Sequence, residues 1–165
     1  MTILGSPRLN VHATGLLLDG RGVLLRGPSG AGKSLLALEL LDRQALFGRP
    51  GLLLADDRVE LERVGGGITM HAPQTIAGLI ELRGRGIVRR PFAASGPLTL
   101  VVDLVEALVR MVEEDELTTD LLGVPVPRCP VPRRGIVDGG HQMLLIEAAL
   151  AALGASRPEC RQNTT

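Results

Sequence analysis

The chain of 165 residues balances 18 basic against 18 acidic side chains, and its formal net charge of zero excludes the broad electrostatic attraction on which general nucleic-acid binding depends. Aromatic residues make up only 1% of the sequence, which leaves almost no side chains to stack on bases. At this length we expect one hydrophobic core, filled by Leu, Val, Ile and Ala.

The cysteines and the hydropathy pattern predict a soluble, cytoplasmic protein. Cys129 and Cys160 form no CxxC pair, so neither a zinc site nor a disulfide framework is indicated. No apolar run approaches the ~20 residues that cross a bilayer, and the N-terminus lacks the residue order of a signal peptide. We therefore expect no membrane partner and a reducing compartment.

The first third of the chain predicts a strand, a glycine-rich loop and a helix, in that order. Residues 11–25 form two apolar runs around an Asp-Gly-Arg-Gly turn, which is typical of a β-hairpin. Residues 35–42 are rich in Leu, Ala and Glu without a breaker, which predicts a helix. Residues 52–55 predict a short buried strand that ends at two aspartates.

The middle of the chain is expected to add more strands. Residues 59–64 and 68–71 alternate around three glycines and predict a second hairpin. Residues 76–88 contain irregularly spaced glycines, so we assign neither a helix nor a strand to them. Residues 98–104 predict a strand, with a helical continuation toward Arg110 left open.

The last third begins with a proline-rich segment. Residues 124–132 carry four prolines, so we expect an extended connection and neither an interior strand nor a helix. Residues 143–153 predict a C-terminal helix with Asp138 as a cap. Residues 154–165 are expected to be a flexible tail, which makes 1–165 a single α/β domain.

The strongest motif is GxxxxGK[ST], matched in full before the first predicted helix. Its glycines let backbone N–H groups turn toward phosphates, Lys33 reaches the β and γ phosphates, and Ser34 ligates Mg²⁺. The alternative is a coincidental glycine loop, which the flanking strand and helix disfavour. The residues predicted to bind ATP are Gly27, Pro28, Ser29, Gly30, Ala31, Gly32, Lys33 and Ser34.

Lys33 is also the only lysine in the chain, because 17 of the 18 basic residues are arginine. Chance must place one lysine somewhere. Here it falls at the position where a compact ammonium on a flexible stem suits phosphate binding. We take this as independent support for the motif.

Asp56 and Asp57 follow the predicted strand about twenty residues beyond the loop, where a Walker-B-like carboxylate lies beside the metal. Two adjacent acids indicate two roles, one at Mg²⁺ and the other in accepting a proton from an attacking hydroxyl. The alternative is an Asx turn, with Arg58 pairing a surface acid.

Three further residues are weaker candidates for the same site. Glu81 and Arg83 point to one side of an extended segment, where they could meet metal and phosphate, although a surface ion pair is the commoner explanation. His12 is a candidate for contact with the nucleotide or acceptor, against a core or turn histidine. His71 and His141 show no spacing that indicates a metal.

Five segments together resemble the HPr kinase/phosphorylase family in their order and spacing. The resemblance covers roughly residues 8 to 153, corresponds to that family's C-terminal catalytic domain, and is similar to the short form of several alphaproteobacterial members. The segments are His12 with the hairpin to Arg26, the loop 27–34, residues 55–59, residues 80–88 and residues 124–127.

The resemblance implies the P-loop kinase fold shared with phosphoenolpyruvate carboxykinase, with a mixed sheet. It implies ATP- and Mg²⁺-dependent phosphorylation of a serine on an HPr-like phosphocarrier protein. It leaves open the reverse phosphorolysis and assembly into a homo-oligomer. The implied roles are phosphate and Mg²⁺ binding for Lys33 and Ser34, proton transfer for Asp56, metal contacts for Asp57 and Glu81, and active-site positions for His12 and Arg83.

Two rival functions remain open at this point. A small-molecule kinase could use the same loop. Its ATP turnover would depend on a metabolite, whereas the turnover of an HPr-type kinase depends on a carrier protein. A non-catalytic ATP-binding partner of a sensor kinase is the other rival, which the presence of Asp56 together with Lys33 disfavours.

Overall fold

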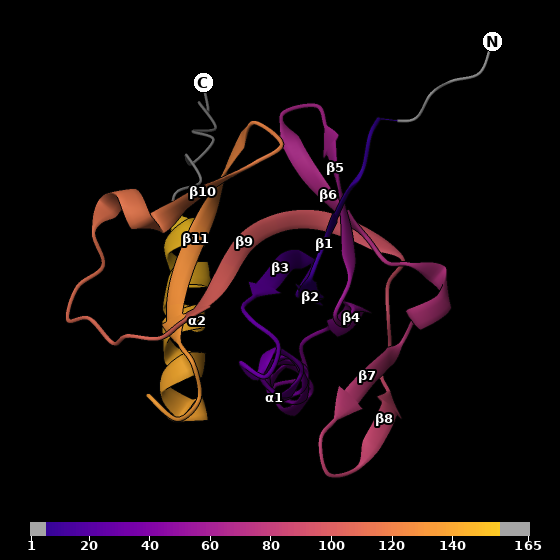
Figure 1. The fold of residues 1–165 in the computed structure, drawn as a ribbon, viewed down its shortest axis with the longest axis horizontal. Coiled ribbons are helices and arrows are strands. Elements are labelled where there is room, and N and C mark those ends of the chain that lie inside the picture. Colours follow the sequence, from indigo (N-terminus) through magenta and orange to yellow (C-terminus); the bar gives the residue numbers. More distant parts are fainter. Residues whose placement is uncertain (1–5, 156–165) are drawn as a thin grey trace, which may run out of the picture.

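The computed structural model describes residues 6–155, which form a curled mixed sheet, a separate β-hairpin and two α-helices (Figure 1). The α/β class and the mixed sheet predicted from the sequence are therefore confirmed. Of the predicted flexible tail, residues 154 and 155 belong to the last helix, and 156–165 lie outside the described residues.

The main sheet has nine strands within the described residues. Strand β9 pairs in parallel with β3 and β11 and antiparallel with β6, so it joins both halves of the sheet. The spatial order is β1 (Leu9–Val11), β5 (Val59–Val64), β6 (Gly67–His71), β9 (Ser95–Val105), β3 (Arg21–Arg26), β2 (Ala13–Leu18) and β4 (Gly51–Ala55), with β11 (Val124–Pro132) beside β9 and β10 (Thr118–Leu121) beside β11.

Strands β2 and β3 are buried on both faces, because alternate side chains enter two different apolar clusters. Leu16 and Val23 belong to a cluster that includes the helix residue Leu36, whereas Leu17 and Leu24 belong to a cluster beneath β5 and β6. This is the period of two expected for a strand, with both faces covered. It explains why the strand sequences read as continuous apolar runs.

Both predicted helices are present and longer than expected. Helix α1 (Lys33–Leu46) begins inside the P-loop motif, and α2 (Gly139–Ala155) begins just after Asp138. The backbone N–H of His141 donates to Asp138 Oδ1 at 2.8 Å, which confirms the predicted cap. Short 3₁₀ helices occur at Gln74–Ile76 and Glu114–Leu117. No helix in the described range has the length and apolarity needed to span a membrane.

The unassigned segment at 76–88 contains the second sheet, a hairpin of β7 (Leu79–Leu82) and β8 (Gly86–Arg89). Gly84 and Gly86 have φ of 91° and 110°, which side chains other than glycine rarely adopt, and so they permit the tight turn. Ile80, with Leu82 and Val88, packs against the α1 cluster. The hairpin is thereby held beside α1 (Figure 1).

Two expectations differ from the structure. Beyond β9, residues 106–113 are a loop, so no helix runs toward Arg110. The proline-rich segment is a strand, β11, and the expectation of a plain connection is wrong. The first half of β11 pairs with β10 and the second half with β9. Each residue of β11 therefore pairs with a neighbouring strand on one side only. Proline is tolerated there because each missing N–H can face the unpaired side.

Candidate active site

The glycine-rich loop connects β3 directly to α1. Gly30 and Gly32 have φ of 82° and 92°, and a side chain at either position would be strained. These two residues turn the chain so that α1 starts at Lys33 with its N-terminal N–H groups at the loop. A helix N-terminus at a glycine loop is a favourable site for phosphate groups.

Lys33 is buried, with 6% of its surface exposed, and its ammonium is held by the loop. Its Nζ donates to the carbonyl oxygens of Gly27 at 2.8 Å and Pro28 at 3.1 Å. Burial lowers the pKa of Lys33, while the charges of Asp57 and Asp56 oppose the shift. The ammonium is therefore fixed at the loop and lies within the electrostatic reach of both aspartates.

Asp56, the residue after β4, receives hydrogen bonds from three different elements. Its Oδ1 accepts from Ser34 Oγ at 2.8 Å and from Thr14 Oγ1 at 2.9 Å, and its Oδ2 accepts from the Glu81 N–H at 3.1 Å. The carboxylate therefore links the start of α1, strand β2 and strand β7. Hydrogen bonds to an ionised acceptor are shorter and stronger than neutral ones, so this carboxylate is well oriented.

Asp57 adopts φ of 68°, which is uncommon for a residue other than glycine. This conformation turns its carboxylate toward His12, whose Nδ1 lies 3.0 Å from Asp57 Oδ1. The His12 side chain is half exposed and that of Asp57 is 73% exposed, so both remain open to a ligand. Strained backbone of this kind is typical of functional sites.

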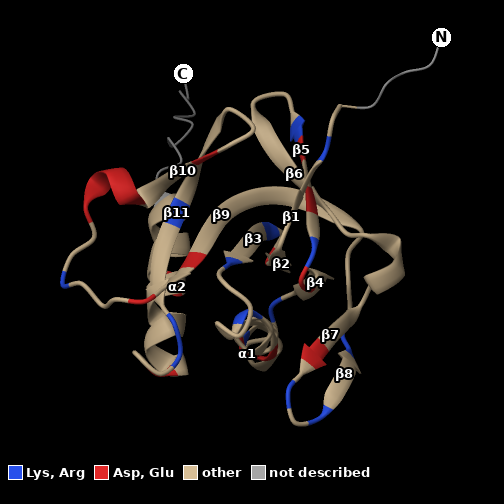
Figure 2. Ribbon diagram, viewed as in Figure 1, with Lys and Arg blue, Asp and Glu red and all other residues tan. Residues whose placement is uncertain are grey.

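One cavity of about 320 Å³ collects most of the predicted site. Its lining combines the cations Lys33 and Arg83 with three carboxylates, and Figure 2 shows the acidic residues at the end of β4 and on β7. The adjoining cleft contains His12 and shares Asp57 with it. The predicted residues that line the cavity are Ser29, Gly30, Gly32, Lys33, Ser34, Asp56, Asp57, Glu81 and Arg83.

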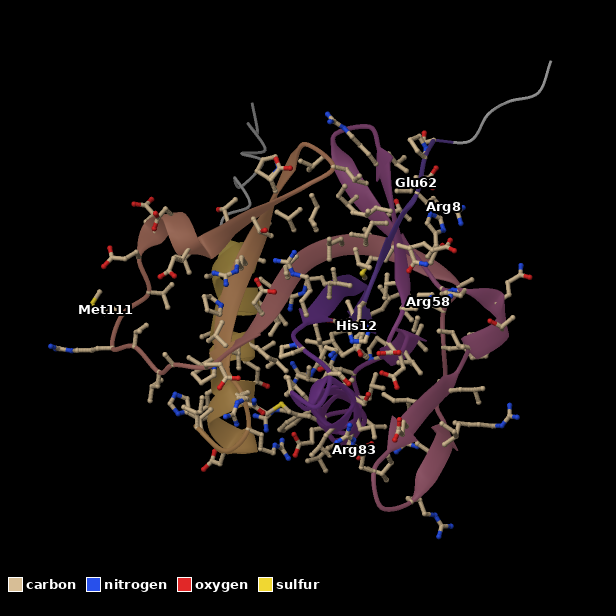
Figure 3. All side chains as sticks on the ribbon, in the orientation of Figure 1. Arg8, His12, Arg58, Glu62, Arg83 and Met111 are labelled. Atoms are coloured by element: carbon tan, nitrogen blue, oxygen red, sulfur yellow. The ribbon has the colours of Figure 1, made fainter. Side chains whose placement is uncertain are left out.

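The remaining candidates lie outside this lining. Gly27 and Pro28 contribute carbonyl groups to Lys33, and Ala31 is buried in the core behind the loop. His12 enters from the junction of β1 and β2, whereas Arg83, which does line the cavity, enters from the turn of the β7–β8 hairpin (Figure 3).

Sequence reasoning missed Thr14, whose hydroxyl contacts Asp56 from 42 residues away. The only sequence signal is a hydroxyl residue inside an otherwise apolar strand, and nothing local indicates its partner. Of the histidines outside the site, His71 pairs through Nε2 with Glu62 Oε2 at 2.8 Å. Within residues 6–155 no group of three or more His, Cys, Asp or Glu side chains is placed to hold a metal.

Comparison with known proteins gives one consistent result. A family model described as the HPr Serine kinase C-terminal domain matches residues 5–162. The HPr kinase/phosphorylase of Bordetella pertussis is 36% identical over 157 residues, a match that covers 88% of this chain and 48% of the relative. That of Clostridium tetani is 31% identical over 159 residues, with the same coverage. The chain spans about half the length of the curated relatives it matches.

A solved structure agrees with the sequence comparison. The HPr(Ser) kinase/phosphatase from Coxiella burnetii superposes with a TM-score of 0.70 and 26% identity, over 89% of this chain and 97% of that one. The implied HPr kinase fold is therefore confirmed for the described residues.

Proposed function

The chain belongs to the family of HPr serine kinase C-terminal domains, and we propose that it is a Mg²⁺-dependent kinase that transfers the γ-phosphoryl group of ATP to a serine of an HPr-like phosphocarrier protein. The observation that carries the proposal is the placement of the P-loop Lys33 and the oriented carboxylate of Asp56 in one cavity. The names of the relatives and of the solved structure support the same reaction. Because ATP and phosphocarrier proteins are intracellular, we place the reaction in the cytoplasm.

In this proposal the loop binds and orients the triphosphate. The N–H groups at the start of α1 receive the phosphate oxygens, and Lys33 exchanges its carbonyl contacts for the β and γ phosphates. Arg83, at the turn of the hairpin, adds a second cation to the lining of the cavity. The two cations oppose the negative charge that is shared among the transferring oxygens.

The donor set at this position suits Mg²⁺. This ion prefers oxygen ligands, keeps several waters, and is usually held by one or two carboxylates together with substrate phosphates. Ser34 offers a hydroxyl, while Asp57 and Glu81 offer carboxylates, and all three line the cavity. When bound, the ion neutralises charge on the phosphates.

Asp56 is the proposed proton acceptor. The serine hydroxyl oxygen of the carrier attacks the γ-phosphorus, the bond from that phosphorus to the β-bridging oxygen breaks, and ADP leaves with the electron pair. The hydroxyl proton passes to the Asp56 carboxylate and then to solvent, so atoms and charge balance. His12, through its contact with Asp57 at 3.0 Å, holds the neighbouring carboxylate in place.

We extend the proposal to the reverse phosphorolysis, which uses the same groups. An oxygen of inorganic phosphate attacks the phosphoserine phosphorus, the bond to the serine oxygen breaks, and that oxygen takes the proton from Asp56. The products are pyrophosphate and the free serine hydroxyl. The geometry required of Asp56 is the same in both directions, because each reaction passes a proton between it and the serine oxygen.

The test is to incubate the protein with γ-labelled ATP, Mg²⁺ and purified HPr-type carriers, and to locate the label. Label on a carrier serine that is lost with Asp56→Asn supports the proposal. Label on a metabolite in place of the carrier favours a small-molecule kinase. Tight ATP binding without any transfer favours a non-catalytic ATP-binding partner of a sensor kinase.

A further inference from the structure

Thr14 is a polar residue in the most deeply buried strand at the site. All six residues of β2 are buried, and Thr14 itself has no exposed surface. Valine would fit such a position without cost, whereas a buried hydroxyl is unfavourable unless it forms a hydrogen bond. The other buried polar side chains in the described range are Lys33, Gln44 and Gln142, and both glutamines donate to backbone carbonyl groups.

The hydroxyl of Thr14 is directed at the proposed proton acceptor. Its Oγ1 donates to Asp56 Oδ1 at 2.9 Å. The contact follows from the sheet register, because Gly15 pairs with Ala55, which places Thr14 beside the residue that follows β4. Threonine is β-branched and restricted at χ1, so the donor is held in one direction.

The three donors to Asp56 differ in what else they do. Ser34 lines the cavity and is proposed to ligate Mg²⁺ through the oxygen that now donates to Asp56. The Glu81 N–H belongs to β7, in the small sheet separate from the main one. Thr14 lies behind the cavity wall, within the main sheet, and Asp56 is the partner of its hydroxyl. Thr14 is therefore the donor without a competing role.

We infer that Thr14 is a positioning residue for phosphoryl transfer: its buried hydroxyl fixes the Asp56 carboxylate for proton transfer and makes no contact with the nucleotide. The inference rests on the proposed function, since Asp56 must be the proton acceptor for this orientation to matter. It assigns a catalytic consequence to a residue that lies outside the P-loop and outside the cavity lining. Small errors in the position of a reacting group have large effects on rate.

The test compares Thr14→Val and Thr14→Ser in steady-state kinetics with ATP and the carrier protein. Thr14→Val keeps nearly the same shape but removes the donor, so we expect kcat to fall about 10-fold while ATP affinity changes less than about twofold. Thr14→Ser restores the hydroxyl and should recover most of kcat. Thr69→Val, in strand β6 of the same sheet, is the matched control, because its hydroxyl makes no hydrogen bond to a side chain within the described residues.

A structural role is separated from positioning by a double-mutant cycle with Asp56→Asn. In that background Thr14→Val should change the residual kcat by less than about twofold, since the carboxylate it orients is gone. Equal losses in both backgrounds would overturn the inference, and so would a Thr14→Val protein with unchanged kcat. If Thr14→Val does not fold, Thr14→Ser and Thr14→Ala replace it in the test. A fall in kcat for Thr14→Ala, which lacks the hydroxyl, but not for Thr14→Ser, which keeps it, supports positioning. Absence of transfer by the unsubstituted protein overturns the proposed function and, with it, this inference.

Discussion

At the scale of single residues, the ammonium of Lys33 has no substitute at the loop. It is buried, and two carbonyl groups of the P-loop hold it in place. The other cation that lines the cavity is Arg83, at the turn of the β7–β8 hairpin. A planar guanidinium differs in shape from a compact ammonium, so we expect arginine to be a poor replacement at this position.

We therefore predict that Lys33→Ala reduces both ATP affinity and phosphoryl transfer by about 10²-fold or more. Lys33→Arg should fail in the same way. Arg49→Ala, which removes one exposed cation at the other end of α1, is the control for net charge. Isothermal titration with ATP and the transfer assay check both quantities, and a Lys33→Ala protein with normal affinity and turnover would show that the loop does not bind the triphosphate.

The second residue-scale prediction concerns Asp56. Asp56→Asn preserves shape and can keep the hydrogen bonds to one oxygen, but an amide does not accept the proton of the attacking hydroxyl. We expect ATP binding within a few-fold of normal and a fall in kcat of ~10²-fold or more. Binding and turnover are measured separately, and a loss of affinity larger than the loss of turnover would assign Asp56 to the metal.

At the scale of elements, the β7–β8 hairpin carries cations that the rest of the protein does not neutralise. Many arginines of the described chain pair with acids, as Arg43 does with Glu147 and Arg133 with Glu106. Arg85 and Arg89 are exposed on the hairpin and make no ion pair within residues 6–155. They form a local positive surface next to the cavity, whose wall includes the hairpin residue Arg83.

We predict that this surface attracts the carrier protein. Arg85→Glu combined with Arg89→Glu should slow association about 10-fold at low salt, weaken the salt dependence, and leave ATP binding intact. Arg49→Glu with Arg63→Glu changes net charge equally at sites away from the cavity and should have little effect. Stopped-flow association at two salt concentrations checks this, and equal effects of the two double variants would place the docking surface elsewhere.

At the scale of the whole molecule, the carboxylate of Asp103 links three strands of the main sheet through ion pairs. Asp103 on β9 accepts from Arg26 Nε at 2.7 Å and from Arg128 Nε at 2.5 Å, which joins β3 and β11 to β9. Burial by itself raises the pKa of Asp103, but the hydrogen bonds and charges of the two arginines outweigh it and hold the pKa below the ordinary value of 3.8. The folded state therefore favours the ionised form.

This linkage predicts how stability depends on pH. Because the folded pKa lies below the unfolded one, the contribution is complete above about pH 5 and is lost as the pH falls through the folded value. Asp103→Asn should destabilise the protein by about 3 kcal/mol at pH 7, since it leaves two partly buried arginines without their partner. The variant should also lose less stability than the native protein on acidification. Urea unfolding from pH 7 to pH 3 measures the stability at pH 7 and its pH dependence, with the exposed Glu106→Gln as control. If the stabilities of the native protein and of Asp103→Asn fall in parallel with pH, the linkage is contradicted.

Much of the candidate site was predictable because its signals are local. The glycines of the P-loop, the position of Lys33 at the start of a helix and the two aspartates after a strand all depend on neighbours within a few residues. The segment at 76–88 was not predictable, because a hairpin of two short strands gives little periodicity and gains its stability from packing against α1. The strand β11 was missed because four prolines are acceptable only when the partners are arranged as they are here.

By itself, therefore, the sequence determined the P-loop motif, the order of strand, loop and helix along the chain around it, and the family resemblance, since turn chemistry and residue period act over short distances. The tertiary structure alone decided which distant groups meet. Thr14 reaches Asp56 only through the register of β2 against β4, and Arg26 meets Asp103 only through the parallel pairing of β3 with β9. Register is set by the burial of both sheet faces at once, and no local pattern in the chain encodes that.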